Sequence, residues 1–200
     1  MNTIIDNDYF LRLSNMDPKD VCRRALCSYD TKKDRYILSI WGEDYCIYPN
    51  ECKIIRIQND DLVTDEFLGV FIAHYLLNAK ESEIKNEWIS EKDLPGGPLF
   101  FRGMHKIPTH YIAEKYGEAI QNFNNICQMR HGISLDMADS AYSFRIAPRI
   151  PVLLQFWEKD EDFMAECKML FDRSISSHLA LDVIFGLSVV VCRGIIKSSH

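Results

Sequence analysis

Three short runs of β-branched and aromatic residues follow one another between residues 35 and 57, and they constrain the fold more than any other stretch. They cover residues 35–41, 44–48 and 53–57, with only Gly42-Glu43 and residues 49–52 between them. Such runs are typical of β-strands. Parallel strands need a crossover of about a dozen residues or more, which these gaps cannot supply. The segment therefore predicts an antiparallel meander.

A second pair of strand-like runs lies late in the chain, in "SAYSFRIAPRIPVLLQFWEKD" (residues 140–160). The runs flank Pro148, and "PVLLQFW" is apolar enough for a central strand. The Ala-Pro-Arg-Ile-Pro segment suits only a turn or a sheet edge, because proline cannot donate a ladder hydrogen bond. The pattern predicts a hairpin.

Helical spacing of apolar residues predicts helices over residues 64–80, 108–131 and 176–197, and Asp17-Pro18 is a typical helix start. An acidic run, residues 158–162, precedes a further helical pattern. The run could bind a hard cation, but acidic residues in a first helical turn are the simpler interpretation.

The chain has 200 residues, 47% hydrophobic and 26% charged, as expected of an ordinary globular chain. We therefore predict one domain over residues 1–200. The fold class is α+β, with an antiparallel or mixed sheet built from the early meander and the late hairpin and covered by several helices. Strand order is left open by the sequence.

Charge and hydropathy exclude several classes of partner. A formal net charge of −6 opposes binding to nucleic acid. The first eight residues include acidic and polar side chains, unlike a secretory signal, so we expect a cytoplasmic protein. The apolar stretch 179–196 is interrupted by Asp182 and Arg193, which favours a core helix over a membrane span.

Seven cysteines are spread along the chain without a Cys-x-x-Cys motif. Cys22 and Cys27 are five apart on an expected helix, so their side chains should point about 140° away from each other. We expect reduced thiols, no metal site and no built-in iron-sulfur cluster.

The stretch "NEWISEKDLPGGPLFFRGMHK", residues 86–106, has no helical or strand period but carries three large aromatics. A disordered linker would lack them, so Trp88, Phe100 and Phe101 predict an ordered loop packed on the body. It is either a candidate site, with Arg102, His105 and Lys106 facing an anion, or a packed Ω-like loop with a solvated basic end.

The candidate ligand site lies where this loop meets the hairpin turn and the acidic run. It comprises seven residues: Trp88, Arg102, His105, Arg149, Trp157, Asp160 and Asp162. They mix large aromatics with both signs of charge, as specific pockets do. Two interpretations stay open: Arg102 or Arg149 pins the loop by pairing with an acidic residue, or it binds a ligand or partner.

Two motifs carry a family resemblance. They are Trp-Ile-x-x-x-x-Leu-Pro-Gly-Gly at residues 88–97, and Trp-x-x-Asp-Glu-x-Phe at 157–163 followed by Leu-Phe-Asp at 170–172. In order and spacing over residues 65–187, the chain resembles the prokaryotic domain of unknown function 3786. The resemblance implies a family common in anaerobes, with some members fused to a four-iron iron-sulfur module. It also suggests anaerobic redox or corrinoid-linked one-carbon metabolism.

Two hypotheses for function follow. The first is an accessory protein that binds a protein partner or a small anionic ligand, since no local motif assembles a nucleophile, a base and an orienting group. The second is an enzyme whose site gathers distant residues around the 86–106 loop and the 157–162 acidic turn. The sequence identifies no cofactor and leaves the oligomeric state open.

Overall fold

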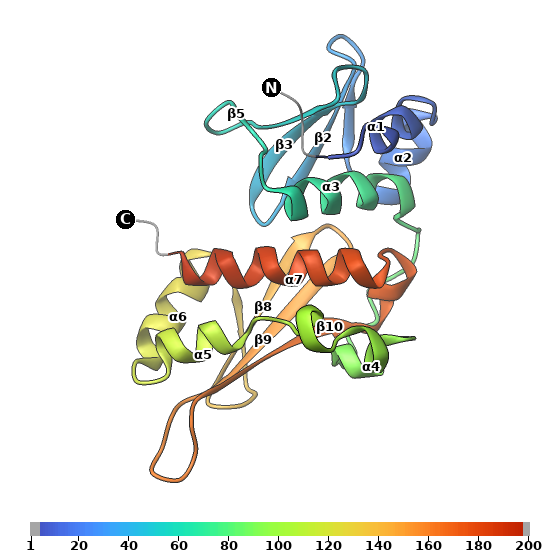
Figure 1. The fold of residues 1–200 in the computed structure, drawn as a ribbon. Helices are drawn as coiled ribbons and strands as arrows, with labels where there is room; N and C mark the ends of the chain where they lie inside the picture. The colour runs from blue at the N-terminus through green and yellow to red at the C-terminus, as the bar shows by residue number, and fades with distance from the viewer. Residues whose placement is uncertain (1–4, 198–200) are drawn as a thin grey trace.

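The computed structural model describes residues 5–197, which form seven α-helices and ten β-strands in two antiparallel sheets (Figure 1). The α+β class and the single compact unit confirm the expectation from the sequence.

The predicted meander forms the first sheet, with strands in sequence order. Its strands are β1 (Ser28–Asp30), β2 (Arg35–Ile40), β3 (Glu43–Tyr48), β4 (Lys53–Arg56) and β5 (Asp61–Leu62). Figure 1 shows three helices beside this sheet: α1 (Asn7–Ser14), α2 (Pro18–Ala25) and α3 (Glu66–Asn78). The helix start predicted at Asp17-Pro18 is confirmed, because the Asp17 carboxylate accepts a hydrogen bond from the Lys19 N–H at 3.0 Å.

The late hairpin belongs to the second sheet, of order β6-β10-β9-β8-β7. Its strands are β6 (Trp88–Ile89), β7 (Ile133–Leu135), β8 (Ser140–Ala147), β9 (Ile150–Trp157) and β10 (Glu166–Asp172). Three helices lie against it in Figure 1: α5 (His110–Tyr116), α6 (Ile120–Met129) and α7 (Leu181–Ile196). None of the helices within residues 5–197 has both the length and the apolar character needed to cross a bilayer.

The expectation that meander and hairpin share one sheet is wrong in this detail. The two sheets meet at one backbone hydrogen bond, from the Trp41 N–H to the Ile146 carbonyl at 2.8 Å. Trp41 has a positive φ of 50°, because the chain turns there into β3. The turn directs the chain away from β8, so the two sheets do not continue into one another beyond this hydrogen bond.

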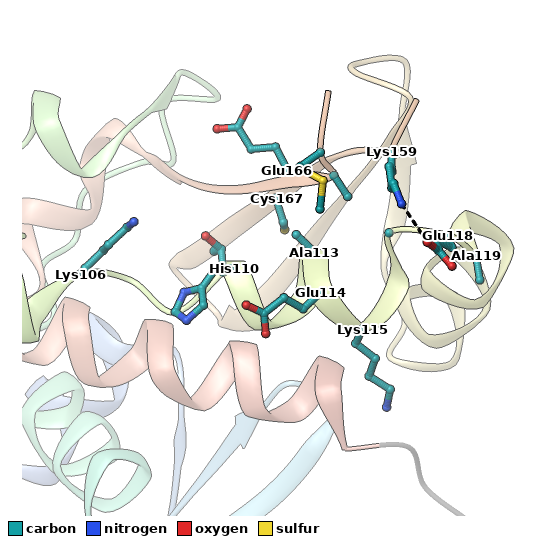
Figure 2. A pocket seen from close by; sticks show the side chains of 14 residues that line it. Lys106, His110, Ala113, Glu114, Lys115, Glu118, Ala119, Lys159, Glu166 and Cys167 are labelled. Carbon is teal, nitrogen blue, oxygen red and sulfur yellow. Dashed lines mark hydrogen bonds and ion pairs between the residues drawn. The ribbon is translucent and has the colours of Figure 1, made fainter. Parts of the chain in front are cut away.

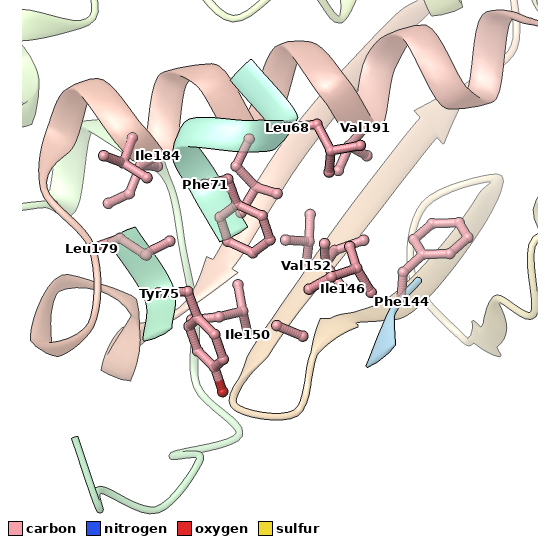
Figure 3. Close-up of a cluster of buried hydrophobic side chains, with 14 of the residues drawn as sticks. Leu68, Phe71, Tyr75, Phe144, Ile146, Ile150, Val152, Leu179, Ile184 and Val191 are labelled. Carbon is pink, nitrogen blue, oxygen red and sulfur yellow. The ribbon is translucent and has the colours of Figure 1, made fainter. Parts of the chain in front are cut away.

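The core lies where α3, α7 and the β8–β9 hairpin converge (Figure 3). Phe71 and Tyr75 from α3 lie with Ile150 and Val152 of β9, and all four are fully buried. The Tyr75 hydroxyl donates to the Ala25 carbonyl at 3.0 Å, so its one polar atom is satisfied.

Two helix predictions need correction. The predicted helix 108–131 is split into α5 and α6 at Gly117, where a β-carbon would lie 2.7 Å from both the Ala113 carbonyl oxygen and the Ala165 β-carbon. The Gly117 carbonyl instead accepts a hydrogen bond from the Lys159 N–H at 3.1 Å, which ends the helix. The helix predicted at 176–197 begins later, at Leu181, after a 3-10 turn over Arg173–Ser177.

The segment after the acidic run is a strand, not the predicted helix. Residues 166–172 become β10 because alternate side chains, Cys167, Met169 and Phe171, are buried against the helices. This period of two is the strand signal.

The expected divergence of Cys22 and Cys27 is also wrong. Helix α2 ends at Ala25, and Leu26 adopts a left-handed conformation with φ 53°. The turn brings the Cys27 N–H to 3.2 Å from the Cys22 carbonyl and the two sulfur atoms to 3.8 Å. The helical rotation that predicted 140° does not apply once the helix has ended.

Candidate functional site

The 86–106 loop is ordered and locally built. It contains β6, a 3-10 turn at Glu91–Asp93, the short helix α4 (Gly97–Phe100) and a 3-10 turn at Gly103–His105. Ser90 and Asp93 form a capping box around the first turn. Gly96 has φ +79°, and a β-carbon on Gly97 would lie 1.9 Å from the Glu91 carbonyl oxygen. The turn therefore requires the two glycines of the Pro-Gly-Gly sequence.

The three loop aromatics are half-buried rather than fully buried. Phe100 stacks on His105 with ring centroids 4.5 Å apart and packs edge-on to Phe101 at 5.1 Å. The His105 ring in turn meets the Phe185 ring of α7 at 5.3 Å. This aromatic column fastens the end of the loop to α7.

One edge of β10 has no neighbouring strand over most of its length. β9 pairs with residues 166–171 on one side, whereas β6 pairs only with Phe171 and Asp172 on the other. The Arg173 N–H donates to the Glu87 carbonyl at 2.9 Å, which fixes the direction of the backbone groups. Because these groups alternate along a strand, those of Met169 and Cys167 face the open edge.

A groove of about 420 Å³ runs along this open edge. Residues 166–170 of β10 form one wall, and the loop forms the other, with Lys92, Phe101 and Lys106 among its lining residues. Ile107 adds buried apolar surface. Neither Lys92 nor Lys106 forms an ion pair with another residue in the described part of the chain. The groove is therefore partly apolar and carries both signs of charge: Glu91 and Glu166 also line it, Glu166 pairs with Lys168 at 3.3 Å, and Lys92 and Lys106 are left as available positive charges.

A second cleft of about 530 Å³ adjoins the groove and shares Lys106, Thr109, Glu166 and Cys167 with it. Figure 2 shows it between α5 and the β9–β10 hairpin, where the Lys159 ammonium donates to Glu118 at 3.1 Å. Charges of both signs line this cleft.

The groove and the second cleft share one thiol, that of Cys167, and it is buried. Burial raises the pKa of this thiol well above its ordinary value, so it is not an activated nucleophile at neutral pH. Among residues 5–197, no group of three or more His, Cys, Asp or Glu side chains is placed to hold a metal ion.

A buried polar network holds the connection between α3 and β6, residues 79–87. The Asp172 carboxylate is fully buried and accepts hydrogen bonds from the Lys85 N–H at 3.0 Å and from the Ser174 N–H and hydroxyl at 2.9 and 2.6 Å. Burial by itself raises the pKa of Asp172, but these hydrogen bonds outweigh it and hold the pKa below its ordinary value. The carboxylate is charged and structural.

Ser82, His178 and Asp172 resemble a hydrolytic triad by residue type only. The His178 Nδ1 accepts a hydrogen bond from the Lys80 N–H at 3.2 Å, so the proton of the neutral ring is on Nε2. Nε2 lies 3.0 Å from the Ser82 hydroxyl and must donate to it. A catalytic base would have to accept the serine proton instead, so this trio is not a nucleophilic site.

His178 gives the fold a pH dependence that can be measured. Burial, and then the charge of Arg149, lower its pKa from 6.5 to about 4. Because the folded pKa is depressed, its stabilising contribution is complete above pH 6.5 and is lost as the pH falls towards 4. We expect a loss of about 3 kcal/mol in the free energy of unfolding over that window.

Urea unfolding of His178→Gln from pH 7 to pH 4 checks this expectation. The variant should lose the part of the pH slope between 6.5 and 4, whereas the exposed control His110→Gln should keep it. An equal slope in wild type and His178→Gln would show that His178 does not titrate as described.

The structure separates the seven residues of the predicted site. Arg102 and His105 are exposed on the loop, and Trp88 lies half-buried in β6 opposite Asp172. Within residues 5–197 the Arg102 side chain forms no ion pair. His105 belongs to the aromatic column.

The other four residues lie along β9 and the hairpin beyond it. Arg149 precedes β9 and donates to the carbonyls of Arg24 and Ser82 at 2.7 and 2.9 Å. Trp157 ends β9, roughly 26 Å from Arg149 along an extended strand at about 3.3 Å per residue. The Asp160 carboxylate accepts from two N–H groups of its own turn, and Asp162 is exposed. The seven side chains do not share one cleft. However, Lys106 of the 86–106 loop and Lys159 of the 157–162 turn both line the second cleft.

The sequence did not indicate the open edge of β10, because the pattern after the acidic run predicts a helix and not a strand. The signal was the alternation of Cys167, Met169 and Phe171 with polar or less buried residues. Of the loop's basic end, only Lys106 lines the groove.

Comparison with known proteins gives one match. The family model described as "Domain of unknown function (DUF3786)" matches residues 17–194. Searches of curated proteins and of solved structures returned no match.

Proposed function

Because the chain belongs to the family of domains of unknown function 3786, whose description gives no activity, we propose a function from the geometry. The protein is a cytoplasmic accessory protein that binds an extended acidic segment of a partner protein along the open edge of β10.

The observation that carries the proposal is the pairing of β10. Met169 and Cys167 present backbone N–H and C=O groups to a groove rather than to a strand. An extended peptide that adds to such an edge gains main-chain hydrogen bonds, and alternate side chains enter pockets beside it. Exposed edges invite pairing with another chain.

The walls of the groove indicate what kind of peptide fits. Phe101 and Ile107 offer apolar contact, and among residues 5–197 neither Lys92 nor Lys106 forms an ion pair, although Glu91 and Glu166 line the same groove. An incoming segment with apolar residues on one face and carboxylates near the lysines complements both. The same two lysines could bind the carboxylate of a small anionic ligand, so the peptide proposal and the anionic-ligand hypothesis use the same recognition chemistry.

The resemblance to the family suggests a setting for this role: a prokaryote, and anaerobic redox or corrinoid-linked one-carbon metabolism. That setting rests on the proteins and pathways with which family members are associated, and an association of this kind does not give a mechanism.

An enzyme is the second proposal, favoured by one observation. Lys106, at the end of the 86–106 loop, and Lys159, in the acidic turn, line the same cleft. An enzyme would bind a small anionic substrate there and turn it over, whereas the accessory protein would bind a peptide without changing it.

Selection from a random peptide display library tests the first proposal. We expect enrichment of extended, β-prone sequences with acidic residues, and loss of their binding to Thr109→Trp, which fills the groove. Tyr111→Trp is the matched control, because Tyr111 is exposed on α5 and does not line the groove. Selected peptides that bind Thr109→Trp as well as wild type would contradict the proposal.

A further inference from the structure

Two thiols lie together at the end of α2, far along the chain from the groove. The sulfur atoms of Cys22 and Cys27 are 3.8 Å apart, close enough for an S–H···S hydrogen bond. A disulfide needs about 2.05 Å between sulfurs, so the two sulfur atoms would have to approach each other by about 1.8 Å to join.

The turn that creates this pair is held firmly. Leu26 adopts a left-handed conformation that is unfavourable for leucine, and its side chain is 54% exposed. On the body side, the Arg24 and Ala25 carbonyls accept hydrogen bonds from Arg149 and Tyr75 at 2.7 and 3.0 Å. These hydrogen bonds therefore anchor the end of α2, immediately before the turn that brings the two thiols together.

The pair can be reached from outside. Cys22 is half-buried and lines a mostly apolar cavity of about 380 Å³, together with Pro18, Tyr29 and Thr31. Cys27 is also half-buried but does not line this cavity. A small molecule entering the cavity meets Cys22 first.

We propose that Cys22 and Cys27 form a dithiol site that reacts with small-molecule disulfides, with Cys22 as the attacking residue and Cys27 as the resolving residue. The Cys22 thiolate attacks one sulfur of RS–SR, whose S–S bond breaks and releases RS⁻. The Cys27 thiolate then attacks the Cys22 sulfur, breaks the mixed disulfide and releases the second RS⁻. The two protons lost by the protein thiols neutralise the two released thiolates, so one disulfide is reduced and one is formed.

Burial sets the speed of this exchange. It raises the pKa of Cys22, and burial and then the neighbouring Cys22 raise the pKa of Cys27. The thiolate is therefore scarce at neutral pH, and the oxidation rate should rise about tenfold per pH unit between 7 and 8.

Glutathione disulfide is the probe for the test. Wild type, Cys22→Ser, Cys27→Ser and Cys52→Ser are treated with it, quenched in acidic denaturant and alkylated for intact-mass and peptide mapping. Wild type should show two alkylated thiols fewer than its seven cysteines, no retained glutathione and a Cys22–Cys27 cross-linked peptide. Cys27→Ser should retain one glutathione on Cys22, because the resolving thiol is gone.

The control Cys52→Ser changes another half-buried cysteine and should still form the bridge. Seven alkylated thiols in oxidised wild type, a persistent glutathione adduct on wild-type Cys22, or a bridge to any other cysteine would overturn the proposal. The mapping of wild type decides the matter even if a serine variant folds poorly.

Discussion

Replacing Asp172 with alanine is expected to lower the free energy of unfolding by about 3 to 5 kcal/mol. The substitution leaves the Ser174 N–H, which is buried, and the Lys85 N–H, which is partly buried, without their acceptor, and each unsatisfied buried donor costs roughly 1 to 3 kcal/mol. The Ser174 hydroxyl loses the same partner. Urea unfolding at pH 7 measures the loss.

Asp172→Asn is the matched control for this prediction. Its side-chain carbonyl can still accept from some of these donors, so the loss should be clearly smaller than in Asp172→Ala. If the free energy of unfolding of Asp172→Ala lies within about 0.5 kcal/mol of the wild-type value, as it does for most surface substitutions, the network does not hold the 79–87 connection.

Charge reversal of Lys92 and Lys106 together is expected to weaken binding of an acidic peptide about 10- to 30-fold. Each exposed ion pair contributes roughly 0.2 to 1 kcal/mol, and reversal replaces attraction with repulsion at both positions. The effect should shrink as salt screens the charges. Fluorescence anisotropy with a selected peptide at low and high ionic strength measures both changes.

Lys32→Glu with Lys33→Glu is the control pair, since it changes the net charge equally on exposed residues of the β1–β2 turn. A peptide whose acidic residues are replaced by lysine should regain affinity for the Lys92→Glu, Lys106→Glu variant. Equal weakening by both double variants would mean that only the overall charge matters.

Local elements of the fold were predictable because their causes are local. The meander follows from gaps too short for a crossover, and the start of α2 follows from Asp17 and Pro18. The division into two sheets depends on contacts distant in sequence, such as the pairing of Trp88 with Asp172. Short patterns do not encode such pairings.

The breaks in the elements depend on neighbours as well. Position 117 has no room for a side chain because Ala165 lies far along the chain but close in space, and the Gly117 carbonyl accepts its hydrogen bond from Lys159. Cys22 and Cys27 meet because Leu26 turns the chain, which helical periodicity could not indicate.

For the site, the sequence identified the loop but not the surface opposite it. The aromatics of residues 86–106 correctly predicted order, and Lys106 is the basic residue of that loop end which lines the groove. Arg149, chosen for its charge, is engaged by two backbone carbonyls. Residue type alone could not distinguish a charge that faces a groove from one that fastens two segments.

Amide hydrogen exchange of β10, with and without a selected peptide, tests strand addition most directly. The Lys168 and Leu170 amides face β9 and should be protected in both states. The Met169 and Cys167 amides face the open edge, so they should exchange readily in the free protein and become protected when the peptide binds. Binding that leaves the exchange of Met169 and Cys167 unchanged would contradict the account.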